Sequence, residues 1–305
     1  MVRRKIIKQA NQAHTITLPI EWVRQNNLDK KNSEVELSIQ DKSLIITNTG
    51  HVSIKKAKLN IETVQNTEKR GLWNKFNALY AQGVDEIEVN CRQEISSVIV
   101  EAINQDIGYA LISHNGDTYI VKDLGGGNYS DIDEIFKRVF QMVLMFYDSA
   151  ITDIFGKEKE TQESLDKRDA EINRFCLYLQ RAINKMSYSD QIKGRVLFTY
   201  SFALEKIGDE ILRLWRTNIE HKVKKTAKIK EIVDLSRKGL DLVFDFYYAF
   251  NPDLAQQIHN LKEKARRIAL TIDKMDGATS KFLHYAIQII EDSADLNLLN
   301  LMKGL

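Results

Sequence analysis

Two pairs of carboxylates recur in this 305-residue chain with the same spacing and similar neighbours. Glu205 and Asp209 stand four residues apart, and Glu291 and Asp295 repeat that spacing 86 residues later. Each Glu follows an apolar residue and each Asp follows a small one. A spacing of four places both carboxylates on one face of a helix, where like charges repel each other. We therefore expect a compensating positive charge at each pair.

That positive charge can be a metal ion or a basic side chain. The faces that carry the pairs continue through apolar residues such as Phe202 and Leu298, which indicates partial burial and a stronger need for compensation. Carboxylate oxygens suit hard cations, so a divalent or ferric ion (Fe, Mg, Mn or Zn) is the candidate cofactor, with Asp148 and Asp245 as further candidate ligands. Ion pairs with Lys or Arg of neighbouring helices remain the alternative.

The composition is typical of a helix-rich protein with two or three domains. The chain has 28% charged residues, 43% hydrophobic residues and two prolines. The basic start at residues 3–5 leads into polar residues, and no run of eighteen apolar residues occurs, so we predict a cytoplasmic protein without membrane insertion. Cys91 and Cys176 lack the spacing of a zinc site or redox pair and are expected to be buried thiols.

Positive charge is concentrated near the amino terminus. Residues 1–60 hold eleven Lys and Arg against five Asp and Glu, whereas the whole chain carries a net charge of only +2. Sequence-independent affinity for nucleic acid comes from Lys and Arg that neutralise phosphates. The candidate DNA-binding set in this segment is Arg3, Arg4, Lys5, Lys8 and Arg24. The alternative is that these residues only keep an exposed strand edge soluble.

Three segments follow one another along the chain. Residues 2–48 alternate with a period of two around a short helix after Pro19, with a turn at 41–42, and bury too little surface to be stable as a monomer. Residues 50–66 are polar, which indicates a linker, and a small α/β module spans about 60–128. The glycines at 125–127 lack a phosphate-loop ending and indicate a connector.

After residue 130 the spacing of apolar residues predicts helix to the end of the chain. Breaks near Gly156, residues 187–189, Pro252 and Gly277, together with the basic run at 222–230, divide residues 130–305 into six long helices. Three helices for each carboxylate pair give two repeats, at about 130–217 and 225–302.

The amino-terminal residues resemble the SpoVT-AbrB family of swapped-hairpin DNA-binding domains. The matching residues are the run Arg4-Lys5-Ile6, the run 16–22 that reads Ile-Thr-Leu-Pro-Ile-Glu-Trp, then Leu28 and the pair Glu34-Val35. The resemblance covers about residues 1–50. It implies an intertwined homodimer whose basic first hairpin and helix edge contact DNA.

The helical segment resembles the PhoU family, whose members are built from two three-helix bundles with an ExxxD motif on the last helix of each. The matching residues are 204–209 and 291–295, with 249–250 and 253–255 at the junction of the fourth and fifth helices. The resemblance implies metal binding by the four carboxylates and a role in phosphate-responsive regulation. Position 292 is Asp where the family often has Arg or Lys.

Together the two resemblances point to the archaeal type of phosphate-uptake regulator. The expected fold is α+β: a swapped-hairpin β domain, a small α/β module and an all-α pair of three-helix bundles. The expected function is that of a homodimeric transcription regulator of phosphate homeostasis. The alternative is an adaptor that docks on a phosphate transporter or kinase without specific DNA binding. No nucleophile arrangement or Glu-x-x-His pairing stands out, so we predict that the protein is not an enzyme.

Overall fold

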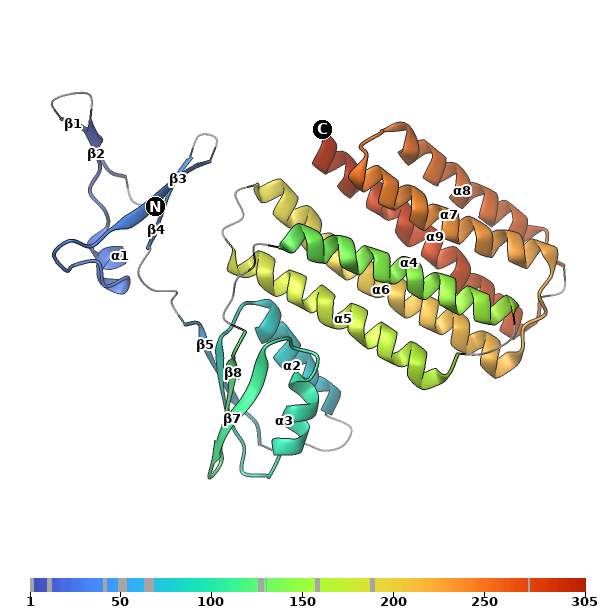
Figure 1. The fold of residues 1–305 in the computed structure, drawn as a ribbon, viewed down its shortest axis with the longest axis horizontal. Helices are drawn as coiled ribbons and strands as arrows, with labels where there is room; N and C mark the ends of the chain where they lie inside the picture. The colour runs from blue at the N-terminus through green and yellow to red at the C-terminus, as the bar shows by residue number, and fades with distance from the viewer. Residues whose placement is uncertain are drawn as a thin grey trace. The chain divides into compact units, whose positions relative to one another are not determined.

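The chain is a mixed α and β protein with small sheets toward the amino terminus and a helical region toward the carboxyl terminus (Figure 1). It divides into two compact units, residues 1–54 and 55–305. The turn expected at 41–42, the glycines at 126–127 and the break expected at 187–189 lie outside the described residues. The computed structural model describes residues 3–9, 13–40, 43–48, 54–62, 69–125, 129, 131–156, 160–186, 190–273 and 275–305.

The amino-terminal unit contains two antiparallel hairpins and one short helix. The pairings join β1 to β2 and β3 to β4. At the start of the segment for which the sequence predicts strands, only Ile7 and Lys8 of the described residues pair with the second strand. The elements are β1 (Ile7–Lys8), β2 (His14–Thr15), α1 (Ile20–Gln25), β3 (Val35–Gln40) and β4 (Ser43–Asn48).

This unit has no core of its own. None of its residues whose burial is described is buried, and Ile6 and Ile39 expose 69% and 82% of their surface. A hydrogen bond of 2.9 Å from the Asn48 side chain to the Asn26 carbonyl joins the second hairpin to the end of α1. Since a small unit folds by removing apolar surface from water, residues 1–54 leave most of that stabilisation unrealised within one chain.

The second unit begins with a four-stranded sheet in the order β5-β6-β8-β7. The pair β5 and β6 is parallel and is connected through α2, whereas the other pairs are antiparallel. Buried residues of α2, α3 and the inner strands form a single core that includes Phe76, Val89 and Tyr119. The elements are β5 (Lys56–Asn60), α2 (Lys69–Ala81), β6 (Glu86–Asn90), α3 (Ser96–Ile103), β7 (Tyr109–Asn115) and β8 (Thr118–Asp123).

Strand β5 lies in the segment for which the sequence predicts a polar linker. Its alternate residues Ala57 and Leu59 pack on the core, while its lysines are exposed. The Nζ atoms of Lys56 and Lys58 approach the carboxylates of Glu86 and Glu88 on β6 to 2.8 and 2.7 Å. The lysines that suggested a linker are therefore the outward face of an edge strand, paired across the sheet with glutamates.

Six long helices follow in the described part of the chain. Four of them begin after a side chain that caps the backbone: Thr161, Asp190, Thr226 and Asp276 each accept a hydrogen bond from the amide three residues later. The predicted breaks near Gly156, Pro252 and Gly277 coincide with helix ends. The helices are α4 (Ile132–Phe155), α5 (Gln162–Lys185), α6 (Gln191–His221), α7 (Ala227–Tyr248), α8 (Asp253–Leu270) and α9 (Gly277–Gly304).

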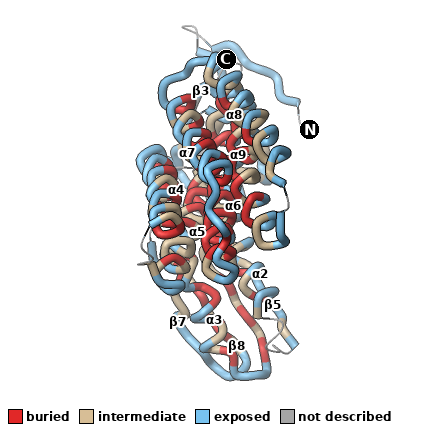
Figure 2. Tube along the Cα trace, turned by 90° about the vertical axis from the view of Figure 1, so that its right-hand side faces the viewer, coloured by how far each residue is buried: buried red, intermediate tan, exposed pale blue. Residues whose placement is uncertain are grey.

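The helices pack in two groups of three around one continuous core. Helices α4, α5 and α6 contact one another, α7, α8 and α9 do the same, and α6 lies along α9 (Figure 1). The buried residues follow the inner faces of these helices (Figure 2). The Tyr200 hydroxyl donates to the Asn300 side chain at 2.6 Å, and Lys206 meets Asp292, which makes α6 and α9 antiparallel.

A buried arginine attaches the sheet module to the helices. Arg181 of α5 is 1% exposed, and its guanidinium lies 4.7 and 5.4 Å from the ring centroids of Tyr80 and Tyr109. Its guanidinium donates to the carboxylates of Asp85 and Asp123 at 3.1 and 2.5 Å. Because a guanidinium is hard to bury without acceptors, these contacts fix α5 against the module. None of the described helices has the length and apolar character needed to cross a bilayer.

Candidate functional site

The first carboxylate pair lies on α6 and faces α5. Glu205 is partly buried, and burial together with the neighbouring Asp209 raises its pKa. Asp209 accepts a hydrogen bond of 2.5 Å from Arg213 on its own helix, one turn further on. Among the described residues, Glu205 forms no ion pair. Arg213 thus pairs directly with Asp209, whereas it offsets only part of the rise in the pKa of Glu205.

A third carboxylate, which the sequence did not indicate, joins this pair from α5. Burial raises the pKa of Asp169 to about 7, and the negative charges of Asp209 and Glu205 add to the effect. The Oδ1 atom of Asp169 is buried and has no hydrogen-bond partner in the described structure. A buried carboxylate oxygen without a donor is costly unless it is protonated or binds a cation. This acidic triad (Asp169, Glu205 and Asp209) is therefore short of positive charge.

The second pair has a different environment. Glu291 of α9 accepts hydrogen bonds of 2.9 and 2.7 Å from Nε and Nη2 of Arg266 on α8. Asp295 is exposed to solvent. In each group of three helices, a residue of the second helix lies against the carboxylates of the third helix. This residue is the acidic Asp169 of α5 in the first group and the basic Arg266 of α8 in the second. At Glu291, the compensating charge is therefore a basic side chain of a neighbouring helix rather than a metal ion.

The residues directly after the two glutamates meet each other. The Nζ atom of Lys206 lies 2.6 Å from Oδ1 of Asp292, whose side chain is 5% exposed. Gln288 donates to the same oxygen at 2.9 Å. Lys206 and Asp292 hold equivalent positions in the repeated motif, so their opposite charges join the two motifs across α6 and α9. An Arg or Lys at 292 would place two positive charges together at this point.

The residues fit a metal ion better at the first pair than at the second. The described residues contain no group of three His, Cys, Asp or Glu side chains already arranged around a metal position. At the first pair, the unpartnered Asp169 oxygen and the Glu205 carboxylate supply hard ligands, and neither side chain forms an ion pair within the described residues. At the second pair, Arg266 already supplies the positive charge. Asp148, suggested as a further ligand, is paired with Arg237 at 2.6 Å.

Three of the candidate DNA-binding residues precede the first hairpin, Lys8 lies on β1, and Arg24 lies on α1. All are exposed, and within the described residues none forms an ion pair. They are Arg3, Arg4, Lys5, Lys8 and Arg24. Exposed cations without acidic partners contribute their full charge to a polyanion, whereas paired ones must first break an existing contact.

Asp169 and Arg266 are the site residues that sequence reasoning missed. Neither lies within a repeated motif, and each reaches its carboxylate partner across two packed helices. Only the helix pairing places them there. Comparison of the chain with models of protein families, with curated proteins and with solved structures finds no match.

Proposed function

We propose that this protein is a homodimeric DNA-binding regulator whose helical region binds a metal ion and responds to phosphate status. The observation that carries the proposal is the amino-terminal unit, where exposed cations without described ion-pair partners stand on a unit without a core. The cations supply affinity for phosphates. The missing core calls for a second copy, because burying the exposed isoleucines and leucines would give the unit the stability that one chain does not.

The apolar residues of this unit are numerous enough to form a dimer core. Those more than half exposed within residues 3–48 are Ile6, Ile7, Ile20, Leu37, Ile39 and Leu44. At about 25 cal/mol per Å² of apolar surface, covering several such side chains contributes several kcal/mol. The proposed dimer resembles the swapped-hairpin arrangement of the SpoVT-AbrB family.

The metal is assigned to the acidic triad of the first helical group. Asp169, Glu205 and Asp209 would hold a divalent or ferric ion, which would supply the positive charge that Asp169 and Glu205 do not receive from an ion pair within the described residues. Lys206 and Asp292 couple this region to the second helical group. The helical region is similar to the PhoU family, and this similarity suggests phosphate as the signal to which the protein responds.

Fluorescence anisotropy of the full-length protein on duplex fragments from its own genome tests the proposal. We expect binding by the wild type and its loss in the variant R4A/K5A/R24A. The control R195A/K222A/K224A removes three exposed cations of the helical region, so it matches the change in net charge and should bind as the wild type does. Absence of binding by the wild type, or equal binding by both variants, would contradict DNA recognition by the amino-terminal unit.

The adaptor function is the second candidate, and an exposed apolar pair favours it. Phe202 on α6 and Leu298 on α9 expose 50% and 64% of their surface beside the carboxylate motifs. Large exposed apolar side chains are typical of protein contact sites when they cluster. A protein that binds no DNA, and that a phosphate transporter or kinase retains unless Phe202 is changed to Ser, would favour this function over the first.

A further inference from the structure

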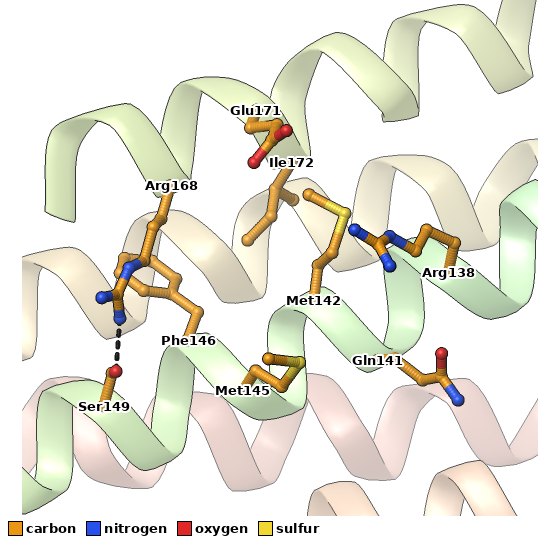
Figure 3. Close-up of a pocket in the computed structure, with 9 residues that line it drawn as sticks. All are labelled: Arg138, Gln141, Met142, Met145, Phe146, Ser149, Arg168, Glu171 and Ile172. Atoms are coloured by element: carbon orange, nitrogen blue, oxygen red, sulfur yellow. Dashed lines mark hydrogen bonds between the residues drawn. The ribbon is translucent and has the colours of Figure 1, made fainter. Parts of the chain in front are cut away.

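A cavity of about 390 Å³ opens between α4 and α5, and none of the carboxylates of the two motifs lines it (Figure 3). One stripe of α4 and three residues of α5 line it. Its volume lies within the range of pockets that bind small organic molecules, which is about 300–1,000 Å³. Most of the cavity wall belongs to long, ordered helices, so the cavity is part of the fold.

The base of the cavity is apolar. Phe146 and Ile172 are each 1% exposed, and the partly buried Met142 packs against the same core. Met145 exposes 70% of its surface, although it is a large apolar residue. Methionine side chains are flexible and polarisable, and they adapt to the shape of an apolar or aromatic ligand.

The charged residues of the cavity differ in what they already bind. Arg168 donates to the Ser149 hydroxyl and lies 2.9 Å from the Glu160 carboxylate, so its charge is compensated. Arg138 forms no ion pair and no hydrogen bond with a described residue. In Figure 3 the two arginines stand at opposite ends of the cavity, with Glu171 on the α5 wall between them.

We propose that this cavity binds a small organic anion with an apolar or aromatic body. The anionic group pairs with Arg138, and the body covers Met142 and Phe146. A bare inorganic anion would leave the apolar base in contact with water, and a neutral apolar molecule would cover Arg138 without giving it a partner. The carboxylate of Glu171 repels a second negative charge near the centre and accepts a hydrogen bond from a hydroxyl or amino group of the ligand.

The cavity adjoins the acidic triad through one helix. Arg168 and Asp169 are consecutive residues of α5, yet Arg168 lines the cavity against α4 while Asp169 interacts with the carboxylates of α6. A ligand that moves α5 relative to α4 and α6 would therefore change the positions of both Arg168 and Asp169. The binding proposal itself depends neither on the metal nor on DNA, so its test is independent of the proposed function.

Methyl NMR of the full-length protein tests the proposal residue by residue. The chain has six methionines, two of which lie at the cavity. With ¹³C-methyl methionine labelling, 1-naphthyl phosphate is titrated beside inorganic phosphate alone and beside neutral naphthalenemethanol. We expect 1-naphthyl phosphate to shift the signals of Met142 and Met145 and to leave that of Met302 unchanged. The two partial probes should bind at least about tenfold more weakly, since each lacks one half of the recognition.

The variant Arg138→Gln should weaken 1-naphthyl phosphate at least about tenfold, because a charge-assisted hydrogen bond is lost. Arg195→Gln removes an exposed arginine of α6 that lies outside the cavity, and it should leave the affinity unchanged. Equal binding by the wild type and Arg138→Gln would overturn the proposal. So would a failure of all three probes to shift the two methionine signals, which would favour a protein segment as the occupant of the groove.

Discussion

Lys206 and Asp292 show how the repeated motifs differ at the level of single residues. They hold equivalent positions after the glutamate of each pair, and their side chains meet at 2.6 Å between α6 and α9. An acidic residue at 292 is thus explained by its basic partner at 206. Asp292 is buried and Lys206 is half-exposed, so the pair is more strongly coupled than a surface ion pair but is still partly screened by water.

A double-mutant cycle with Lys206→Met and Asp292→Asn measures this coupling. We expect a coupling free energy of about 1 kcal/mol in urea unfolding, because each single change leaves the other group without its charged partner. The pair Lys230 and Asp234 on α7 serves as the control, since both side chains are more than half exposed. Its coupling should stay below about 0.5 kcal/mol. Equal coupling in the two cycles would show that burial of Asp292 has no effect.

The sequence predicted the carboxylate pairs of the candidate site but not the residues that surround them. The carboxylate pairs could be found because spacing along a helix determines which residues share a face. Asp169 and Arg266 could not, because they depend on which helix packs beside the motif and in what register. Asp169 and Arg266 change the expected need for positive charge at both pairs. Asp169 adds a third carboxylate to the first pair, and the guanidinium of Arg266 pairs with Glu291 of the second.

The metal assignment predicts a difference between the two pairs. Addition of Mn²⁺ should raise the melting temperature of the wild type, because an ion that binds only the folded state stabilises it. Glu205→Gln should abolish the increase. Glu291→Gln is the matched control and should preserve it. A Mn²⁺ effect that disappears in Glu291→Gln and persists in Glu205→Gln would contradict the assignment to the acidic triad.

At the level of elements, the helices were more predictable than the strands. Gly156, Pro252 and Gly277 interrupt the apolar period and coincide with helix ends, as glycine and proline favour. Strand β5 was missed because its two lysines resemble those of a linker. Their role depends on Glu86 and Glu88, which lie 30 residues further along the chain and become neighbours only when the sheet forms. The composition of residues 50–66 alone therefore could not predict the pairing of these lysines with the glutamates of β6.

The loop between α3 and β7 carries a carboxyl group that makes the sheet module sensitive to pH. Asp106 is 3% exposed, both its carboxyl oxygens lack a hydrogen-bond partner in the described structure, and burial raises its pKa to about 8. Arg181 offsets part of this effect. The folded state therefore retains a proton between pH 4 and pH 8 that the unfolded chain releases, and the free energy of unfolding falls as the pH rises through this range.

The variant Asp106→Asn should remove this part of the pH dependence. Urea unfolding at pH 6 and pH 8.5 compares the two proteins. We expect the free energy of unfolding to fall more for the wild type than for Asp106→Asn between these values. Only the wild type has a buried carboxyl group that holds a proton in the folded state after the unfolded chain has released it. The same loss of stability in both proteins would show that Asp106 does not titrate within the folded state.

At the scale of the whole molecule, positive charge and the missing core coincide in one unit. Residues 1–54 hold the candidate DNA-binding cations and no described buried residue, whereas residues 55–305 contain both hydrophobic cores. In the proposed function, this division would separate recognition of a polyanion and self-association from the binding of small ligands and metal. It gives each proposed activity its own set of residues.

The salt dependence of DNA affinity tests the central claim most directly. For the full-length wild type, the logarithm of the association constant should fall linearly with the logarithm of salt concentration. The variant R4A/K5A/R24A should show a slope smaller by about one for each phosphate contact removed, and R195A/K222A/K224A should retain the wild-type slope. Binding that is insensitive to salt, or an unchanged slope in the first variant, would contradict the account of the amino-terminal unit as the DNA-contacting part of the protein.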